Sequence, residues 1–286
     1  VEIMKKEYVL TFSCPDQKGI QAKTSNFLFS NNAFLTDVQS YSDEKTQSFF
    51  SRIVFSFDDL DGIASNFMNE FDGLAKELSM NWNINDLNKK MKTLIAVSKE
   101  GHCLNDLLYR TKYKDMPIDI VGVVSNHETF KEIVEFNGYK FHYLPIKDNK
   151  QKQEEEFHDI AFQSGTELIV LARYMQILSQ DFVSKWSNNC INIHHSFLPS
   201  FKGSKPYHQA YDKGVKIIGA TAHYVTEDLD EGPIIEQDVE RVNHRDTTAD
   251  MTRKGNTIES NVLAKAVRWH AEKKILLNGS KTIVFS

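Results

Sequence analysis

Residues 190–196 read CINIHHS, an apolar run that ends on an amide and two imidazoles. Four further short apolar runs precede it, at 92–98 (KTLIAVS), 118–125 (IDIVGVVS), 140–146 (KFHYLPI) and 167–174 (ELIVLARY). Helix-like segments such as 154–165 and 179–188 lie between several of these runs. This alternation predicts an α/β fold with a mostly parallel sheet that helices cover on both faces. Ligands of such sheets bind beyond the carboxyl ends of the strands, where this stretch holds its polar residues.

The first part of the chain has a different pattern. We expect a strand at 8–14, a helix at 19–32, strands at 34–42 and 47–57, a helix at 63–80 and a strand at 81–87. This βαββαβ order is that of the ferredoxin-like split unit. The polar stretch 86–92 is the predicted linker, so that residues 1–85 and 93–286 form separate domains.

The last third of the chain continues the second domain. A hairpin is expected from the apolar runs 216–227 and 233–242, with a turn between them. A long helix is expected at 248–277.

The composition excludes several classes of protein. No apolar run approaches the ~20 residues of a membrane span, and the first residues show no signal-peptide pattern. The net charge of −5 and the pI of about 6.1 argue against a nucleic-acid partner. The three cysteines, Cys14, Cys103 and Cys190, form no C-x-x-C motif. We therefore expect free thiols and a cytoplasmic protein.

The end of the 190–196 stretch suits chemistry at a carbonyl group. In a regular strand Asn192 and His194 share one face, and His195 points to the other. The amide of Asn192 can donate to a developing oxyanion, and an imidazole titrates near neutral pH. The acidic segment TEDLDEG (226–232) could supply a carboxylate that orients the histidine, and its candidates are Glu227, Asp228, Asp230 and Glu231.

Other interpretations of these residues stay open at this stage. An Asn-x-His pair is often structural, and an acidic segment is often a solvated turn. Four histidines, His194, His195, His208 and His223, could also ligate a metal ion. Adjacent histidines on a regular strand do not face one ion, and no His-x-His spacing occurs, so we expect no metal site.

Longer stretches around these residues resemble a known family. INIHHSFLPSFKG (191–203), followed by GATAHYVTEDLDEGPIIEQ (219–237), is similar to the formyltetrahydrofolate transferase and hydrolase superfamily. Its motif is Asn-Ile-His, then Leu-Pro-Ser-Phe-x-Gly, then an Asp shortly before a Gly. Segments 97–110 and 242–255 resemble the deformylase branch in particular. The N-terminal part resembles an ACT domain, with Asp16, Gly19 and Ile20 at its D-x-x-G-I turn.

The resemblance implies a function and a set of site residues. The implied reaction is hydrolysis of 10-formyltetrahydrofolate to tetrahydrofolate and formate, which feeds purine synthesis and needs no bound cofactor. Asn192 would stabilise the oxyanion, His194 would move a proton, and Asp230 would orient the imidazole or the water. The residues expected to surround the folate are Arg173, Tyr174, Met175, Gln176, Ile177, Leu178, His195, Val225, Thr226, Glu227 and Asp228.

The ACT-like part implies partners. Such domains pair with one another, so a dimer or tetramer is expected. An amino-acid effector at the turn formed by Asp16, Gly19 and Ile20 is the accompanying hypothesis.

Two departures from the glycinamide-ribonucleotide transferase branch favour water as the acceptor. His195 stands where that branch usually has proline. The loop that binds the ribonucleotide phosphate there is glycine-rich, whereas this chain has one glycine, Gly101, and an acidic Glu100. Two alternatives remain: a formyltransferase with an amine acceptor, and a non-catalytic amino-acid sensor.

Overall fold

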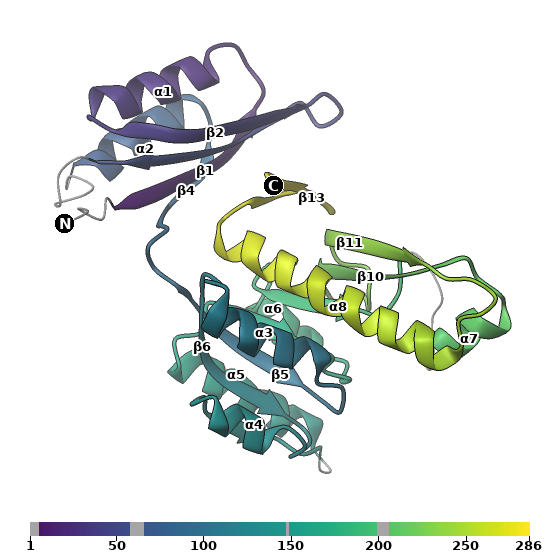
Figure 1. Ribbon diagram of the computed structural model, residues 1–286. Coiled ribbons are helices and arrows are strands. Elements are labelled where there is room, and N and C mark those ends of the chain that lie inside the picture. Colours follow the sequence, from purple (N-terminus) through teal and green to yellow (C-terminus); the bar gives the residue numbers. More distant parts are fainter. Residues whose placement is uncertain (1–5, 58–65, 147–148, 199–205) are drawn as a thin grey trace. The chain divides into compact units, whose positions relative to one another are not determined.

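The structure is a computed structural model, and it describes residues 6–57, 66–146, 149–198 and 206–286 (Figure 1). The chain divides into two compact units. The first comprises the chain up to Lys90 with Glu272–Asn278 and Ile283–Ser286, and the second comprises Met91–Ala271 with Gly279–Thr282. The division lies inside the predicted linker 86–92, but that segment is not a free linker, because strands occupy both of its ends.

The first unit has the predicted βαββαβ order. Its elements are β1 (Glu7–Pro15), α1 (Ile20–Ser30), β2 (Phe34–Asp43), β3 (Ser48–Ser56), α2 (Phe67–Glu77) and β4 (Asn81–Asp86). The strands form an antiparallel sheet in the order β2-β3-β1-β4. Strand residues such as Phe12 and Phe55 pack against Leu28 of α1 and Phe71 of α2 in its core. Of the helix predicted at 63–80, residues 63–65 lie outside the described residues.

The ACT-like turn is built as its sequence suggests. Gly19 has a φ of 88° and precedes the first residue of α1, a backbone conformation that favours glycine. The backbone N–H of Asp16 donates to the carbonyl of Gln47 at 2.9 Å. The side chain of Ile20 is 2% exposed and belongs to the core. Ile20 therefore anchors the helix, and Asp16 and Gly19 form the accessible part of the turn.

The second unit is built on a seven-stranded sheet. Its strands are β5 (Met91–Val97), β6 (Ile118–Ser125), β7 (Phe141–Tyr143), β8 (Leu168–Leu171), β9 (Cys190–His194), β10 (Ile217–Tyr224) and β11 (Ile234–Arg241). The order is β11-β10-β9-β8-β5-β6-β7. Strands from β7 to β9 are parallel, and β10 and β11 are antiparallel additions at one edge. The mostly parallel α/β sheet is thus confirmed.

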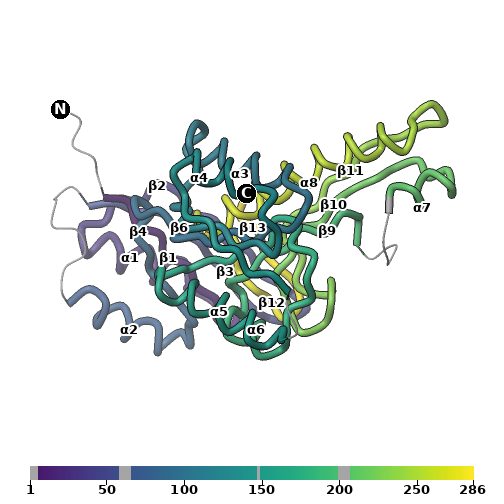
Figure 2. The backbone as a smooth tube through the Cα atoms, turned by 90° about the horizontal axis from the view of Figure 1, so that it is seen from below, coloured from purple at the N-terminus to yellow at the C-terminus, as the bar shows by residue number. Residues whose placement is uncertain are grey.

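Helices cover both faces of this sheet (Figure 2). The helices of this unit are α3 (His102–Tyr113), α4 (Lys131–Phe136), α5 (Lys150–Gln163), α6 (Gln180–Lys185), α7 (Pro206–Asp212) and α8 (Thr248–Ala271), of which α7 contacts α8. Phe157 of α5 and Phe182 of α6 pack with Leu94 and Ile169 of the sheet. Helices α3 and α8 contact each other on the opposite face. The central strands β5 and β8 are buried on both faces, so functional groups reach solvent at the ends of these strands.

The prediction of one helix over 248–277 is wrong at its C-terminal end. Helix α8 ends at Ala271, and two short strands follow, β12 (Ile275–Asn278) and β13 (Lys281–Val284). Lys273 has a φ of 55° and ends the helical path, and Gly279, at 60°, forms the turn between the strands. Apart from Gly279–Thr282, the hairpin groups with the first unit, whereas the predicted catalytic domain continues to residue 286.

Among the described residues, no helix combines the length and the apolar character that crossing a bilayer requires.

Candidate active site

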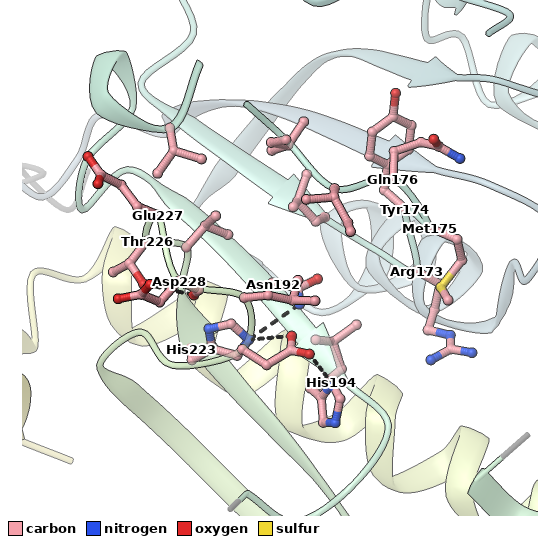
Figure 3. A pocket seen from close by; sticks show the side chains of 18 of the residues that line it. Arg173, Tyr174, Met175, Gln176, Asn192, His194, His223, Thr226, Glu227 and Asp228 are labelled. Carbon is pink, nitrogen blue, oxygen red and sulfur yellow. Dashed lines mark hydrogen bonds and ion pairs between the residues drawn. The ribbon is translucent and has the colours of Figure 1, made fainter. Parts of the chain in front are cut away.

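A pocket of about 380 Å³ lies beyond the carboxyl ends of β8 and β9 (Figure 3). Every residue predicted to be catalytic or to bind folate lines it. Its described lining residues are Leu171, Arg173–Leu178, Val183, Asn192–His195, His223 and Val225–Asp230. The polar groups predicted from two distant stretches of sequence therefore meet at one place, the carboxyl end of a parallel sheet.

Strand β9 presents the amide and the first imidazole. Ile191 and Ile193 are buried in the strand between β8 and β10, whereas Asn192 and His194 alternate with them and line the pocket. Two apolar side chains on the other face hold the strand in register, so Asn192 and His194 cannot slip without exposing them.

The prediction that His195 points away from His194 is wrong. Strand β9 ends at His194, so the alternation of a strand does not extend to the next residue. The two imidazole rings stack with centroids 4.8 Å apart and an interplanar angle of 23°. Both histidines line the same pocket.

Asp230 approaches the first imidazole. Its Oδ2 atom lies 3.3 Å from Nδ1 of His194, and its backbone has a φ of 59°. The imidazoles of His194 and His223 hold the pKa of Asp230 well below its usual range, although burial opposes them. Asp230 is thus a carboxylate beside Nδ1 of His194, a position that favours a hydrogen on that nitrogen, and Nε2 is the other nitrogen of that ring. This buried Nε2 atom has no hydrogen-bond partner among the described residues.

A further histidine, His223, belongs to the same cluster (Figure 3). Its Nδ1 lies 2.9 Å from the carbonyl oxygen of Tyr224, which can only accept, so Nδ1 carries a hydrogen. In the neutral ring Nε2 then accepts from Nδ2 of Asn192 at 3.3 Å. The distance from Nε2 to Oδ1 of Asp230, 3.6 Å, is too long for a hydrogen bond.

Sequence reasoning considered His223 only as a metal ligand and missed this position. His223 faces Asn192 across paired strands β10 and β9. That pairing joins residues distant in sequence, so no local signal revealed it.

The acidic loop is held against the end of β10 by close backbone contact. The N–H of Val225 donates to the carbonyl of Cys190, and the N–H of Tyr224 to that of Pro233. A Cβ atom on Gly232 would lie 1.7 Å from the carbonyl oxygen of Tyr224. Glycine at 232 therefore allows the loop to fold back, which brings Asp230 over the sheet.

The opposite wall of the pocket is the segment 173–178. The buried hydroxyl of Ser98 accepts from the N–H of Met175 at 3.0 Å and fixes this segment to the end of β5. The side chains of Met175 and Ile177 are 57% and 62% exposed, as expected of an apolar surface that a ligand covers. Tyr174, in contrast, packs in the core beside Phe157.

Behind the two stacked histidines lies a buried polar network. Nη1 of Arg173 donates to Nδ1 of His195 at 2.7 Å, and Nε lies 3.4 Å from Oε2 of Glu259. Glu259 is fully buried and also accepts from Nε2 of His102 and the hydroxyl of Tyr207. Burial raises the pKa of Glu259, but His102, Arg173 and Tyr207 together outweigh it, and the net shift is downward.

This network depends on a close contact at Gly255 and on the protonation state of His195. A Cβ atom on Gly255 would lie 1.9 Å from the hydroxyl of Tyr207, so glycine lets the tyrosine lie against α8 and reach Glu259. Burial, Arg173 and His194 lower the pKa of His195 to about 4. His195 is consequently neutral near pH 7, with its hydrogen on Nε2.

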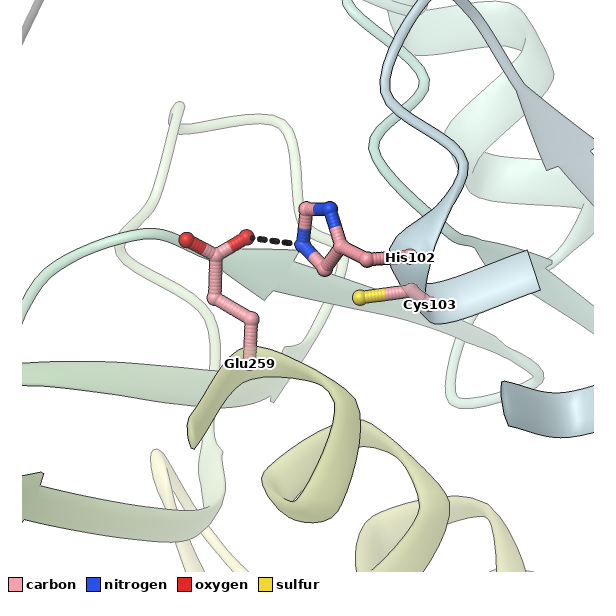
Figure 4. Close-up of side chains that lie close together, drawn as sticks. All are labelled: His102, Cys103 and Glu259. Atoms are coloured by element: carbon pink, nitrogen blue, oxygen red, sulfur yellow. Dashed lines mark hydrogen bonds and ion pairs between the residues drawn. The ribbon is translucent and has the colours of Figure 1, made fainter. Parts of the chain in front are cut away.

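The side chains of His102, Cys103 and Glu259 lie close enough to hold a metal ion (Figure 4). Both carboxylate oxygens of Glu259 already accept hydrogen bonds, and the guanidinium of Arg173 stands beside them. Burial raises the pKa of the Cys103 thiol, which disfavours the thiolate that binds metals. The donor set therefore fits a hydrogen-bond network better than a metal site.

The ring of Phe130 packs against the loop that follows β5. Gly101 precedes α3, and a Cβ atom there would lie 2.3 Å from the ring of Phe130. Glu100 is exposed beside it. The start of α3 thus has a ring against its backbone and a negative charge next to it. The motif residues 199–203 lie outside the described residues.

The chain is similar to known proteins over most of its length. The family model described as "Formyl transferase" matches residues 91–267. A formyltetrahydrofolate deformylase of Corynebacterium sp. (strain P-1) is 44% identical over 278 residues, 97% of each chain. The crystal structure of the formyltetrahydrofolate deformylase of Burkholderia mallei matches with a TM-score of 0.93 and 44% identity, over 98% of this chain and all of that one.

A transferase matches only part of the chain. The phosphoribosylglycinamide formyltransferase of Anaplasma phagocytophilum is 31% identical with a TM-score of 0.64. The match covers 69% of this chain and 96% of that one.

Proposed function

The chain belongs to the formyltetrahydrofolate deformylase family, and on that basis we propose how its pocket hydrolyses 10-formyltetrahydrofolate to tetrahydrofolate and formate. The observation that carries the proposal is the convergence of Asn192, His194 and Asp230 in one pocket with an apolar wall. Met175 and Ile177 offer that wall to the folate ring system, and the loop 225–230 offers backbone and polar groups. The folate-binding role of these residues is part of the proposal.

Asn192 stabilises the charge that develops on the formyl oxygen. One hydrogen of its Nδ2 group points to His223, which leaves the other for the oxyanion. His223 therefore acts as a positioning residue. Because its Nε2 accepts a hydrogen bond, the amide nitrogen of Asn192, rather than the amide oxygen, faces His223. Loss of one such donor typically lowers the rate by about 10²–10³.

His194 and Asp230 handle the protons. Water attacks the formyl carbon, and Nε2 of His194 takes its proton while Asp230 accepts from Nδ1–H and stabilises the imidazolium. Because its pKa is held below the usual range, Asp230 is a poor base, and we assign the initial proton abstraction to His194. The C–N bond then breaks, the folate nitrogen takes the proton, and the formic acid released loses its own to become formate.

Water rather than an amine is the acceptor in this proposal. A ribonucleotide acceptor needs a phosphate site at a helix start, and Phe130 against Gly101 with Glu100 alongside opposes one. No bound cofactor or metal is required by the steps above. The transferase alternative has no comparable observation in its favour.

The N-terminal unit supports a proposal on regulation. We infer that it pairs subunits into a dimer or tetramer, and that the turn with Asp16 and Gly19 binds a small amino acid. Calorimetric titration with all twenty amino acids tests the second part, and the absence of both heat and any change in activity would leave only pairing. Three buried free thiols, Cys14, Cys103 and Cys190, support a reducing, cytoplasmic environment.

A turnover assay without any amine tests the proposed function. The purified protein is given 10-formyltetrahydrofolate alone, and tetrahydrofolate and formate are measured separately. We expect both to appear in equal amounts. A transferase or a non-catalytic sensor would release neither.

A further inference from the structure

Arg173 occupies a backbone position that is unfavourable for it. Its φ is 64°, in the left-handed region where glycine is preferred and other residues are strained. Arg173 lies two residues after the end of β8, and its side chain points toward His195 and Glu259.

Arg173 is also the only lysine or arginine among the described residues that line the pocket. The same lining includes three carboxylates, Glu227, Asp228 and Asp230. Hydrolysis of a formamide produces an anion, formate, next to Asp230, which would repel it. Formyl transfer to an amine produces a neutral formamide, so only the hydrolytic reaction creates a need for a cation at this position.

The guanidinium has donors available for an anion. Nη1 donates to His195, and Nε lies 3.4 Å from Glu259 without hydrogen-bond geometry. The Nη2 group makes no hydrogen bond to a described residue. Glu259, which accepts from His102 and Tyr207, lies beside the guanidinium. The neutral His195 carries an N–H at Nε2 that has no partner among the described residues.

We propose that Arg173, with His195, forms a binding site for the carboxylate of the product formate, and that Glu259 positions the guanidinium for it. The inference rests on the proposed hydrolysis, because formate is its product. Arginine binds carboxylates through two parallel N–H donors, a geometry that lysine does not reproduce. Glu259 reduces the positive potential of Arg173, so binding is weak enough for the product to leave.

The test measures formate binding directly on the full-length protein. Sodium [¹³C]formate is titrated into protein saturated with tetrahydrofolate, and broadening of the formate signal is followed at constant ionic strength. Arg173→Gly suits this position, because glycine relieves the left-handed backbone. We expect it to weaken formate binding at least tenfold, with Arg173→Lys intermediate. Arg253→Ala removes an arginine that is 76% exposed on α8, and it should bind formate as the wild type does.

A double variant guards against a folding defect. Arg173→Gly leaves Glu259 buried without its guanidinium, so Arg173→Gly/Glu259→Gln removes both charges and should also lack formate binding. Wild-type affinity in either folded variant, or no formate binding by the wild-type protein, would overturn the inference. Failure of the wild type to release formate from 10-formyltetrahydrofolate would refute the proposed function instead, since the titration does not depend on turnover.

Discussion

Nδ1 of His194 lies 3.3 Å from Oδ2 of Asp230, across a loop that a glycine allows to fold back over the sheet. In the proposed mechanism the carboxylate favours a hydrogen on that nitrogen and leaves Nε2 for proton exchange with water. In the same mechanism the carboxylate of Asp230 both orients the imidazole of His194 and stabilises its charged form.

Asp230→Asn tests that contact. The substitution keeps the shape of the side chain but removes its charge, so we expect kcat for deformylation to fall by about 10²–10⁴ with the fold intact. Asp159→Asn, at an exposed position of α5, is the control and should keep wild-type turnover. Near wild-type activity of Asp230→Asn would show that the carboxylate has no part in the reaction.

His223→Leu tests the assignment that sequence reasoning missed. Without its imidazole, Asn192 loses the acceptor that orients its amide, a hydrogen bond worth about 0.5–1.5 kcal/mol. We expect kcat to fall about tenfold while KM for 10-formyltetrahydrofolate stays unchanged. A rise in KM at constant kcat would instead place His223 in substrate binding.

The low pKa of His195 predicts a dependence of stability on pH. Its value falls from 6.5 to about 4 in the folded protein, because of burial first and of Arg173 and His194 next. Between pH 6.5 and 4 the unfolded chain therefore binds more protons at this residue, and stability decreases as the pH falls. The contribution is at most about 3 kcal/mol.

Denaturant unfolding of the wild type and of His195→Gln at pH 7, 6, 5 and 4.5 measures this contribution. The difference in free energy of unfolding between the wild type and the variant should decrease toward acid pH. A difference in free energy of unfolding that stays constant over this range would contradict the assignment of His195 as a neutral, buried base.

Chelation tests the prediction that no metal is needed. Glu259 is engaged by His102, Tyr207 and Arg173, and the proposed steps use only side chains and water. Turnover should survive exhaustive treatment with EDTA. A reproducible loss of activity that zinc restores would revive a metal site at His102, Cys103 and Glu259.

Local sequence patterns were sufficient for both sheets and for the position of the site. Alternating apolar runs and helices predict where strands end, and the ends of parallel strands meet at one edge. Asn192 and His194 could therefore be placed in a pocket, and Asp230 followed from the family motif. All of the predicted folate-binding residues line the same cavity, although Tyr174 lies mostly in the core.

Interactions between distant elements were not predictable in this way. The role of His223 depends on the pairing of β10 with β9, and the network around Glu259 joins α3, α7 and α8. The orientation of His195 depends on the strand ending one residue earlier. The segment 272–277 has the composition of a helix end, but Lys273 in a left-handed conformation turns it into the hairpin of β12 and β13.

The central claim is that water accepts the formyl group, and isotopic labelling tests it most directly. The protein is incubated with 10-formyltetrahydrofolate in H₂¹⁸O, with and without glycinamide ribonucleotide. We predict that each formate released contains one oxygen from solvent, and that the ribonucleotide neither accelerates folate turnover nor captures the formyl group. Formylated ribonucleotide as the main product would contradict the hydrolytic mechanism.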